Sequence, residues 1–256
     1  MDGLVAGPLA RSVLGPVLLV GPTIPTVIRT ELTRRGADHA IIVGGTGAVS
    51  ATVAAELVAL GLTVDRVSGT DRYATAAEVA KRVGLTTKAA IVASGEAGSL
   101  VDALSASGPA SALHRPIVLV KKDSVPTVTA TALATLGVTV TTCVGGTGVI
   151  SESVRTSLPA CSRAGGVDRW DTAVVVASAF SGLVPPTQVT VTGGRDANLV
   201  DALGAGSLGQ LVLLSPATAS GSVLAWLQRT PIITRLNVVG GTAAMPAVAV
   251  TGMRNA

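Results

Sequence analysis

The chain has 256 residues, a formal net charge of +4 and a sequence pI near 9.6, and 48% of its residues are hydrophobic but only 2% aromatic. It has no run of Lys and Arg and almost no ring on which a base could stack, which excludes a typical nucleic-acid binder. No uninterrupted apolar stretch reaches the roughly 18 residues that a membrane-spanning helix needs, so we expect no membrane span. The first residues also lack the basic and apolar regions of a signal peptide.

Three segments that begin with an aspartate and continue as a small-residue helix open the predicted units, at Asp2, Asp102 and Asp201. Four or five apolar residues follow each of them and predict a short, buried parallel strand, at 16–20, 116–120 and 211–214. A helix comes next, at about 24–35, 125–136 and 217–229. A second strand then ends in Gly-Gly-Thr, at 41–47, 143–148 and 238–242.

Further strands and helices link these units. Residues 62–66 predict a strand, and a helix carries residues 73–81 with Asp71 as its N-cap. Residues 89–93 and 188–192 predict strands that lead into the next aspartate-containing helix. Strands that alternate with helices at this spacing favour right-handed βαβ units and therefore an α/β fold.

One string of residues occurs twice. Residues Arg66–Ala76 recur as Arg163–Ala173, 97 positions later, and both copies read R-x-x-G-x-D-R-[YW]-x-T-A. So particular a string indicates an internal repeat. Two copies accompany three Gly-Gly-Thr turns, so the chain holds fewer than three full repeats. We therefore expect Met1 to lie inside a repeat, in a fragment or processed piece of a longer, exported protein.

This set of motifs resembles the cell wall-binding repeat 2 modules of Gram-positive surface proteins. The resemblance rests on the repeated string, on Asp-Ala-Leu at 102–104 and 201–203, on Pro-Ile-Val-Leu at 116–119, and on the three Gly-Gly-Thr turns. It implies three tandem α/β modules of Toprim-like or Rossmann-like appearance in a pseudo-threefold arrangement. We divide the chain into modules at 1–64, 65–161 and 162–256, the first of them lacking its N-terminal part.

The resemblance also implies a function. Members of the family attach surface or secreted proteins non-covalently to the cell wall, through an anionic polysaccharide or a teichoic-type polymer. We expect this chain to do the same outside the cell, and we expect no cofactor. The alternative is a structural assembly subunit, such as a surface-layer or filament component, that uses the fold to contact other copies of itself or other surface proteins.

The Gly-Gly-Thr turns are interpreted first as architecture. They follow a strand and open a helix, where backbone N–H groups can hold an anion, but they lack the Gly-Lys-Ser/Thr of a phosphate loop. Glycine also permits a tight strand-to-helix turn, which three repeated turns fit better than a single catalytic centre. The residues assigned to these structural turns are Gly44, Gly45, Gly145, Gly146, Gly240 and Gly241.

The arginines of the repeated string have two possible roles. Arg66, Arg72, Arg163 and Arg169 could form ion pairs with the aspartates of the string and with Asp102 and Asp201, or they could face a groove and hold phosphate or acidic sugar. The resemblance associates the apolar strands with polymer binding as well, although their apolar composition is typical of strands in a protein core. The strand residues that become binding candidates on this ground are Pro16, Leu18, Pro116, Val118 and Leu213.

Catalysis is poorly supported by the sequence. His39 and His114 have no Ser or Cys partner in a nucleophile motif, and no spacing of residues suggests a metal site, so we predict that the chain is not an enzyme. Cys143 and Cys161 are the only cysteines, and the repeat maps them onto Ile42 and Val64. If their strands are neighbours in one sheet, they could form a disulfide; two free thiols are the alternative.

Overall fold

The computed structural model describes residues 2–196 and 199–256; Met1, where the predicted first module starts, lies outside them. The strands form three separate sheets, and every described pair of strands is parallel. The prediction of an α/β fold built from three strand–helix modules is confirmed.

The first sheet has two strands, β1 (His39–Val43) and β2 (Thr63–Val67). Before it come the short 3-10 helix η1 (Asp2–Val5) and α1 (Ala6–Ser12), and beside it lie α2 (Thr26–Arg35) and α3 (Ala51–Ala59). Ile42 of the sheet, Val53 and Leu57 of α3 and partly buried Ile28 of α2 belong to one apolar cluster, so the two helices cover this sheet.

The second sheet has the strand order β4-β3-β5-β6. Its strands are β3 (Ala89–Ser94), β4 (Ile117–Val120), β5 (Val140–Val144) and β6 (Cys161–Ala164). Its helices are α4 (Arg72–Val83), α5 (Val101–Ala112), α6 (Thr127–Thr135) and α7 (Glu152–Ser157). All residues of β3 are buried, as expected for a central strand with helices on both faces.

The third sheet has the order β8-β7-β9. Its strands are β7 (Gln188–Gly193), β8 (Leu211–Ser215) and β9 (Arg235–Val239). Its helices are α8 (Arg169–Phe180), α9 (Leu199–Ala205), the 3-10 helix η3 (Gly206–Leu208), α10 (Gly221–Gln228) and α11 (Ala247–Arg254).

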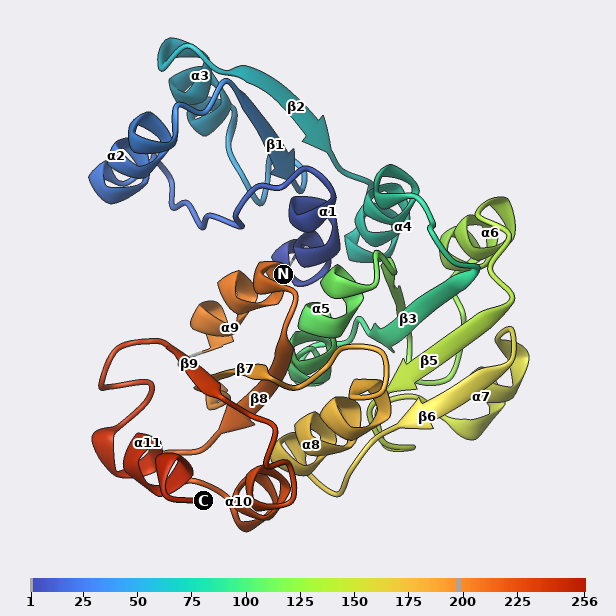
Figure 1. Ribbon diagram of the computed structural model, residues 1–256. Helices are drawn as coiled ribbons and strands as arrows, with labels where there is room; N and C mark the ends of the chain where they lie inside the picture. Colours follow the sequence, from blue (N-terminus) through green and yellow to red (C-terminus); the bar gives the residue numbers. More distant parts are fainter. Residues whose placement is uncertain (1, 197–198) are drawn as a thin grey trace.

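Three equivalent helices, α1, α5 and α9, meet at the centre of the molecule, and the three sheets lie around them (Figure 1). This is the predicted pseudo-threefold arrangement. One apolar cluster includes Leu4 before α1, Leu104 of α5 and Leu213 of β8, so the modules share a core. At Gly108 a Cβ would lie 1.8 Å from the carbonyl oxygen of Gln210, which shows how closely α5 packs against the third module.

The prediction of a strand at 16–20 is wrong. These residues have no strand structure, and Pro16 and Leu19 are exposed. The equivalent strands β4 and β8 pair only with β3 and β7. In the first sheet, no described strand takes the place of β3 next to β1. An extended segment without a hydrogen-bonding neighbour does not form a ladder.

The repeat of the sequence and the repeat of the sheets are out of phase. The predicted divisions at 64/65 and 161/162 fall inside β2 and β6, and these strands pair with β1 and β5 of the preceding sheet. The chain then crosses to α4 or α8, the first helix of the next module. Each copy of the repeated string therefore lies at a junction between two modules.

Candidate functional site at the module junctions

The first arginine of the string is bound to the Gly-Gly turn of the preceding sheet. Arg66 Nη1 donates to the Gly44 carbonyl at 2.7 Å, and Arg163 Nη1 donates to the Gly145 carbonyl at 2.9 Å. Arg163 also donates to the Ile150 carbonyl at 2.9 Å and lies 3.3 Å from Glu152. Backbone carbonyls are the partners that these two arginines share, and not the aspartates that one of our two alternatives gave them.

The glycine of the string stands where the chain closely approaches the next helix. A Cβ at Gly69 would lie 2.4 Å from the Cβ of Ala74, and one at Gly166 would lie 2.4 Å from Asp171 Oδ2. The N–H of each glycine donates at 3.0 Å to the threonine of the string, Thr75 or Thr172. No larger residue fits this turn.

The aspartate of the string caps the next helix. Asp71 Oδ1 accepts from the Ala74 N–H at 2.8 Å, which confirms its prediction as an N-cap, and Asp168 accepts from the Asp171 N–H at 2.8 Å. A cap of this kind satisfies one of the helix's unpaired N–H groups.

The second arginine reaches forward to the end of the next module's central strand. Arg72 Nη1 donates to the Gly95 carbonyl at 2.7 Å, and Arg169 Nη1 donates to the Gly194 carbonyl at 3.0 Å. Arg169 also forms an ion pair with Asp196. The two arginines of the string thus bind in different modules, the first to the sheet that ends at the junction and the second to the module that begins there.

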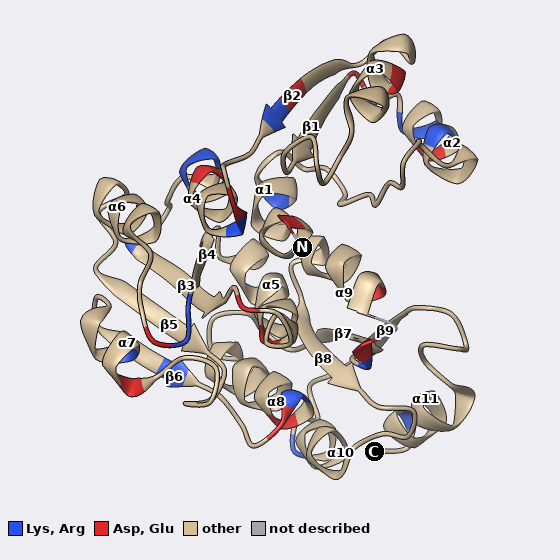
Figure 2. Cartoon of the chain, turned by 180° about the vertical axis from the view of Figure 1, so that it is seen from behind, with Lys and Arg blue, Asp and Glu red and all other residues tan. Residues whose placement is uncertain are grey.

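An aromatic ring follows the second arginine and lies against the same glycine. A Cβ at Gly95 would lie 2.5 Å from Tyr73, and one at Gly194 would lie 2.3 Å from Trp170. Both rings are partly exposed. Lys121 Nζ lies 6.0 Å from the centroid of the Tyr73 ring, and the Arg169 guanidinium lies 5.9 Å from the Trp170 ring. Figure 2 shows basic residues on α4 and α8, the helices that begin at these junctions.

We name these places the junction sites: Arg72, Tyr73 and Gly95 at the first, Arg169, Trp170 and Gly194 at the second. Each combines an arginine fixed by a carbonyl, an accessible ring and a glycine at the carboxyl end of a parallel strand. Crevices outside the carboxyl ends of such strands are where α/β proteins commonly bind ligands. The chain has only four aromatic residues, so two of them at equivalent junctions are a signal that the sequence contained and our interpretation missed.

A buried carboxyl group lies near the second junction site. Burial raises the pKa of Asp102 to about 6, an effect that the positive charge of Arg169 partly opposes. The carboxyl faces Gly145, since a Cβ there would lie 2.7 Å from Asp102 Oδ2. Asp2 and Asp201 face Gly44 and Gly240 in the same way.

The Gly-Gly turns are tight strand-to-helix turns. Their first glycines, Gly44, Gly145 and Gly240, have φ of 115°, 111° and 115°, a backbone conformation that residues other than glycine rarely adopt. Their second glycines have no such φ, and nothing lies close to the Cβ positions of Gly45 and Gly241. The first glycine is therefore the one that the turn requires.

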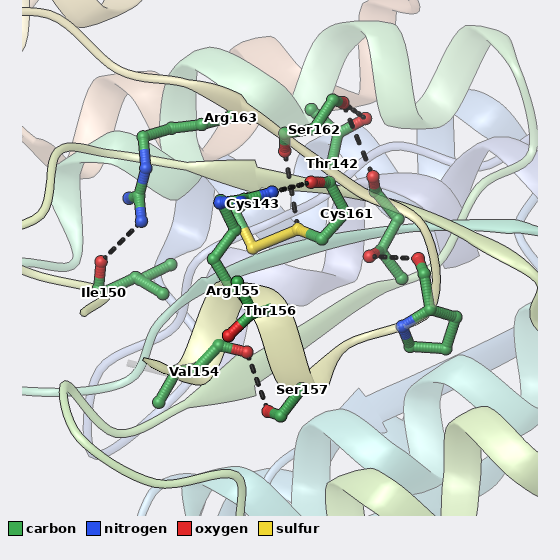
Figure 3. The surroundings of a disulfide bond; sticks show 12 residues. Thr142, Cys143, Ile150, Val154, Arg155, Thr156, Ser157, Cys161, Ser162 and Arg163 are labelled. Carbon is green, nitrogen blue, oxygen red and sulfur yellow. Dashed lines mark hydrogen bonds between the residues drawn. A yellow bond between two sulfur atoms is a disulfide. The ribbon is translucent and has the colours of Figure 1, made fainter. Parts of the chain in front are cut away.

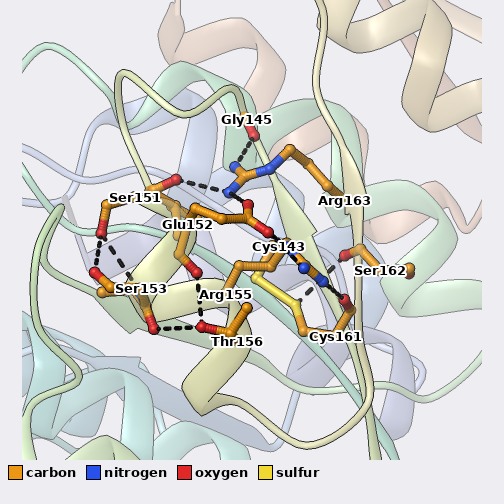
Figure 4. A network of polar contacts seen from close by, with 12 residues as sticks. Cys143, Gly145, Ser151, Glu152, Ser153, Arg155, Thr156, Cys161, Ser162 and Arg163 are labelled. Carbon is orange, nitrogen blue, oxygen red and sulfur yellow. Dashed lines mark hydrogen bonds and ion pairs between the residues drawn. A yellow bond between two sulfur atoms is a disulfide. The ribbon is translucent and has the colours of Figure 1, made fainter.

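Cys143 of β5 and Cys161 of β6 form a disulfide, with their Cα atoms 6.3 Å apart (Figure 3). The two strands are neighbours, and Cys161 lies opposite Thr141, diagonal to Cys143. Beside the disulfide, Glu152 binds both Arg155 and Arg163, and Arg155 donates to the Cys161 carbonyl (Figure 4). These arginines hold the pKa of Glu152 below its usual value, through the hydrogen bond from Arg155 first. The edge strand β6 is thus fixed to the sheet by a covalent bond and by an ion-pair network.

The apolar strand candidates have little surface to offer a ligand. Val118 and Leu213 are completely buried, and Pro116 is buried as well. Pro16 is exposed and Leu18 half-buried, in the segment that is not a strand. The structure therefore buries three of the five strand candidates inside the protein, on or beside the strands β4 and β8 that flank the junction glycines.

The histidines lie apart from one another in the fold. His39 Nε2 is 3.3 Å from Asp65 on the first sheet, and His114 follows the end of α5 with a φ of 49°. Within residues 2–196 and 199–256, no group of three or more His, Cys, Asp or Glu side chains could hold a metal ion. Across the same residues, no helix has the length and apolar character that crossing a bilayer requires.

The fold and the junctions define an α/β repeat protein in which parallel sheets surround three central helices. The family model of cell wall binding domain 2 matches residues 1–54, 66–155 and 163–250, and the chain belongs to this family. It is a family of binding modules of cell-surface proteins, as the repeated string indicated.

Two curated relatives come from Bacillus subtilis (strain 168). The N-acetylmuramoyl-L-alanine amidase LytC is 35% identical over 173 residues, which cover 67% of this chain and 34% of LytC. The amidase enhancer is 34% identical over 127 residues, covering 49% of this chain and 17% of its own length. The chain thus spans about a third or less of the curated relatives that it matches.

Two solved structures from Clostridium difficile have the same fold. Cwp8 superposes with a TM-score of 0.87 at 26% sequence identity, covering 99% of this chain and 45% of Cwp8. Cwp6 superposes with a TM-score of 0.86 at 26% identity, covering 94% of this chain and 40% of Cwp6. The likeness extends across all three modules.

Proposed function

We propose that the chain is a non-catalytic module that holds a surface or secreted protein on an anionic cell-wall polymer outside the cell, and that the junction sites are where it binds. The observation that carries this proposal is the arginine beside a partly exposed ring, anchored identically at both junctions. The formal net charge of +4 supports an anionic ligand.

The chemistry of each junction site suits a charged sugar polymer. An arginine has five N–H donors in a fixed fork, and one terminal nitrogen of Arg72 or Arg169 is used by the glycine carbonyl. The remaining donors match the oxygens of a phosphate or carboxylate, and the carbonyl bond holds the guanidinium in place for them. The adjacent ring of Tyr73 or Trp170 offers an apolar face against which a sugar can pack.

The two junction sites differ in charge. At the first, Lys121, which lies over Tyr73, and Lys122 add two positive charges, and Glu96, which accepts from the backbone N–H of Lys122, adds one negative charge. At the second, Arg195 follows Gly194, and Asp196 neutralises Arg169. The first junction site is therefore expected to bind an anion more strongly. In this proposal Arg66 and Arg163 have a structural role, because they are bound to the Gly-Gly turns.

The test is co-sedimentation with purified cell walls, before and after extraction of their anionic polymers. Arg72→Gln removes a charge-assisted contact that contributes about 1.5–3 kcal/mol, so wall affinity should fall by roughly tenfold or more. Arg169→Gln should weaken binding less. Walls without their anionic polymers should bind neither the unaltered chain nor the variants.

Two controls separate binding from folding. Arg34→Gln changes an exposed arginine of α2 that pairs with Glu31, and it should leave wall binding unchanged. Lys121→Gln with Lys122→Gln removes charge at the first junction site without breaking a described side-chain hydrogen bond, so it should weaken binding at an unchanged melting temperature. If Arg72→Gln and the double variant Lys121→Gln with Lys122→Gln both bind walls normally, the junction is not the binding site.

A further inference from the structure

The Gly-Gly turn of the third sheet lacks the partners that the other two turns have. The N–H of Gly44 donates to the Val67 carbonyl at 2.9 Å, and that of Gly145 donates to the Ala164 carbonyl at 2.9 Å. Those carbonyls belong to β2 and β6. Among the described residues, the N–H of Gly240 has no such partner, and its carbonyl accepts from no arginine. The turn itself has the same shape, with a φ of 115° at Gly44 and at Gly240.

The strand before this turn has an open edge. β1 pairs with β2, and β5 pairs with β6, but β9, which stands in the same position, has β7 as its only neighbour among the described residues. A cavity of about 430 Å³ lies against β9 and is lined by Leu236, Val238, Val250 and Met253, among others. Val238 is 40% exposed, whereas its equivalent Cys143 is completely buried under β6.

A helix is missing from the same face. In the modules that have the string, the helix after it packs on a central helix: α4 contacts α1, and α8 contacts α5. In the described parts of the chain no equivalent helix covers α9, and Val200 on it is 56% exposed. Arg195 donates to the Ala243 carbonyl of this turn, but in the described residues the Gly240 N–H and carbonyl are left without the partners found at Gly44 and Gly145. This turn, the open strand edge and the uncovered helix therefore lie where a copy of the string would place its arginine, its strand and its helix.

We propose that this face binds one further strand–turn–helix segment with the string R-x-x-G-x-D-R-[YW]. This segment is distinct from the two copies at residues 63–83 and 161–180 of this chain. Its strand pairs in parallel with β9, and its last carbonyl accepts from the Gly240 N–H. Its first arginine donates to the carbonyls of Gly240 and Met245, as Arg163 does to those of Gly145 and Ile150. Its helix then covers α9.

The two strings already present do not meet this need. β2 and β6 are paired with their own sheets, and the disulfide holds β6 in place. A second copy of this chain would have to unfold part of its own sheet to supply either strand. A separate segment loses nothing of that kind, and backbone pairing along an open edge is a common way of binding an extended peptide.

The test uses the whole chain and a synthetic peptide of residues 159–181. In the protein, Val238→Cys places a thiol where β5 has Cys143, and Cys143 and Cys161 remain bonded to each other. In a thiol–disulfide buffer, the peptide should form a 1:1 disulfide with this variant through its cysteine at position 161. A peptide with Cys161→Ser and Ser162→Cys presents its thiol to the opposite face of the strand and should react at least tenfold less.

Matched variants make the result specific. Val27→Cys, an exposed position on α2, should react slowly and equally with both peptides. Binding of the peptide to the unaltered chain should be saturable and should weaken about tenfold with Arg163→Gln in the peptide. Equal reaction of both peptides with Val238→Cys, or no saturable binding, would overturn the proposal. Dimers of the Val238→Cys variant that excess peptide does not displace would assign the face to a second copy instead. None of these outcomes bears on wall binding at the junction sites.

Discussion

The central helices α5 and α9 occupy equivalent places but are covered to different extents. Every residue of α5 from Val101 to Ser111 is buried, because α1 of the first module and α8, η3 and β8 of the third pack around it. On α9, only Ala202 and Ala205 are buried, and Val200 is 56% exposed. A module of this kind thus completes its interior with a helix that belongs to the next copy of the string.

The largest effect should come from filling the close contact of α5. A Cβ at Gly108 would lie 1.8 Å from the Gln210 carbonyl oxygen, and a backbone carbonyl cannot move aside easily. We expect Gly108→Ala to lower the free energy of unfolding by about 3 kcal/mol or more, measured by urea denaturation. Gly204→Ala on α9 is the matched variant, because its nearest neighbour is the Val17 carbonyl oxygen at 4.0 Å. It should be neutral or slightly stabilising, and equal losses in the two variants would show that the two helices are packed alike.

The disulfide distinguishes the second sheet from the first, which has Ile42 and Val64 at the equivalent positions. Closing a loop over a sequence separation of 18 is expected to stabilise the folded state by about 3 kcal/mol. Replacing Cys143 and Cys161 together with serine should therefore lower the urea midpoint clearly. Reductant should lower the midpoint of the unaltered chain and leave that of the double variant unchanged. Two free thiols counted in the unreduced, denatured chain would contradict the disulfide.

The burial of Asp102 should make stability depend on pH. Its pKa in the folded chain is about 6, above the unfolded value of 3.8, so its contribution is fully present below about pH 4. That contribution is lost as the pH rises through 6, and the loss amounts to at most about 3 kcal/mol. Unfolding should therefore become easier between pH 4 and 7, and Asp102→Asn should flatten that slope. Asp201→Asn, at the half-buried equivalent position on α9, should retain it.

The repeat carried most of the fold prediction. Alternating apolar segments and the Gly-Gly-Thr turns predicted the strands, and the spacing of the string predicted the modules. The strand predicted at 16–20 was wrong because a strand depends on its neighbour: the same apolar pattern forms β4 beside β3, whereas no described strand of the first sheet takes the place of β3. Local pattern does not contain that information.

The partners of the arginines could be predicted only in part. The sequence indicated that Arg66, Arg72, Arg163 and Arg169 belong to the scaffold or to a groove, but it pointed to aspartates as their partners. Each binds a backbone carbonyl at the end of a strand, and carbonyls have no sequence signature. The rings of Tyr73 and Trp170 were visible in the string, yet their contact with Gly95 and Gly194 depends on how two modules meet.

The offset between the sequence repeat and the sheets has a consequence for recombination. A gene segment cut just before the string would divide β2 or β6, and would leave a Gly-Gly turn without its arginine. A cut between the strand and the capping aspartate would transfer whole sheets. Each transferred unit would then carry the helix, α4 or α8, that packs on the central helix of the preceding module. No single crossover point yields a self-sufficient module, so duplication or exchange of these units should succeed only when a neighbour is present to receive the overlapping piece.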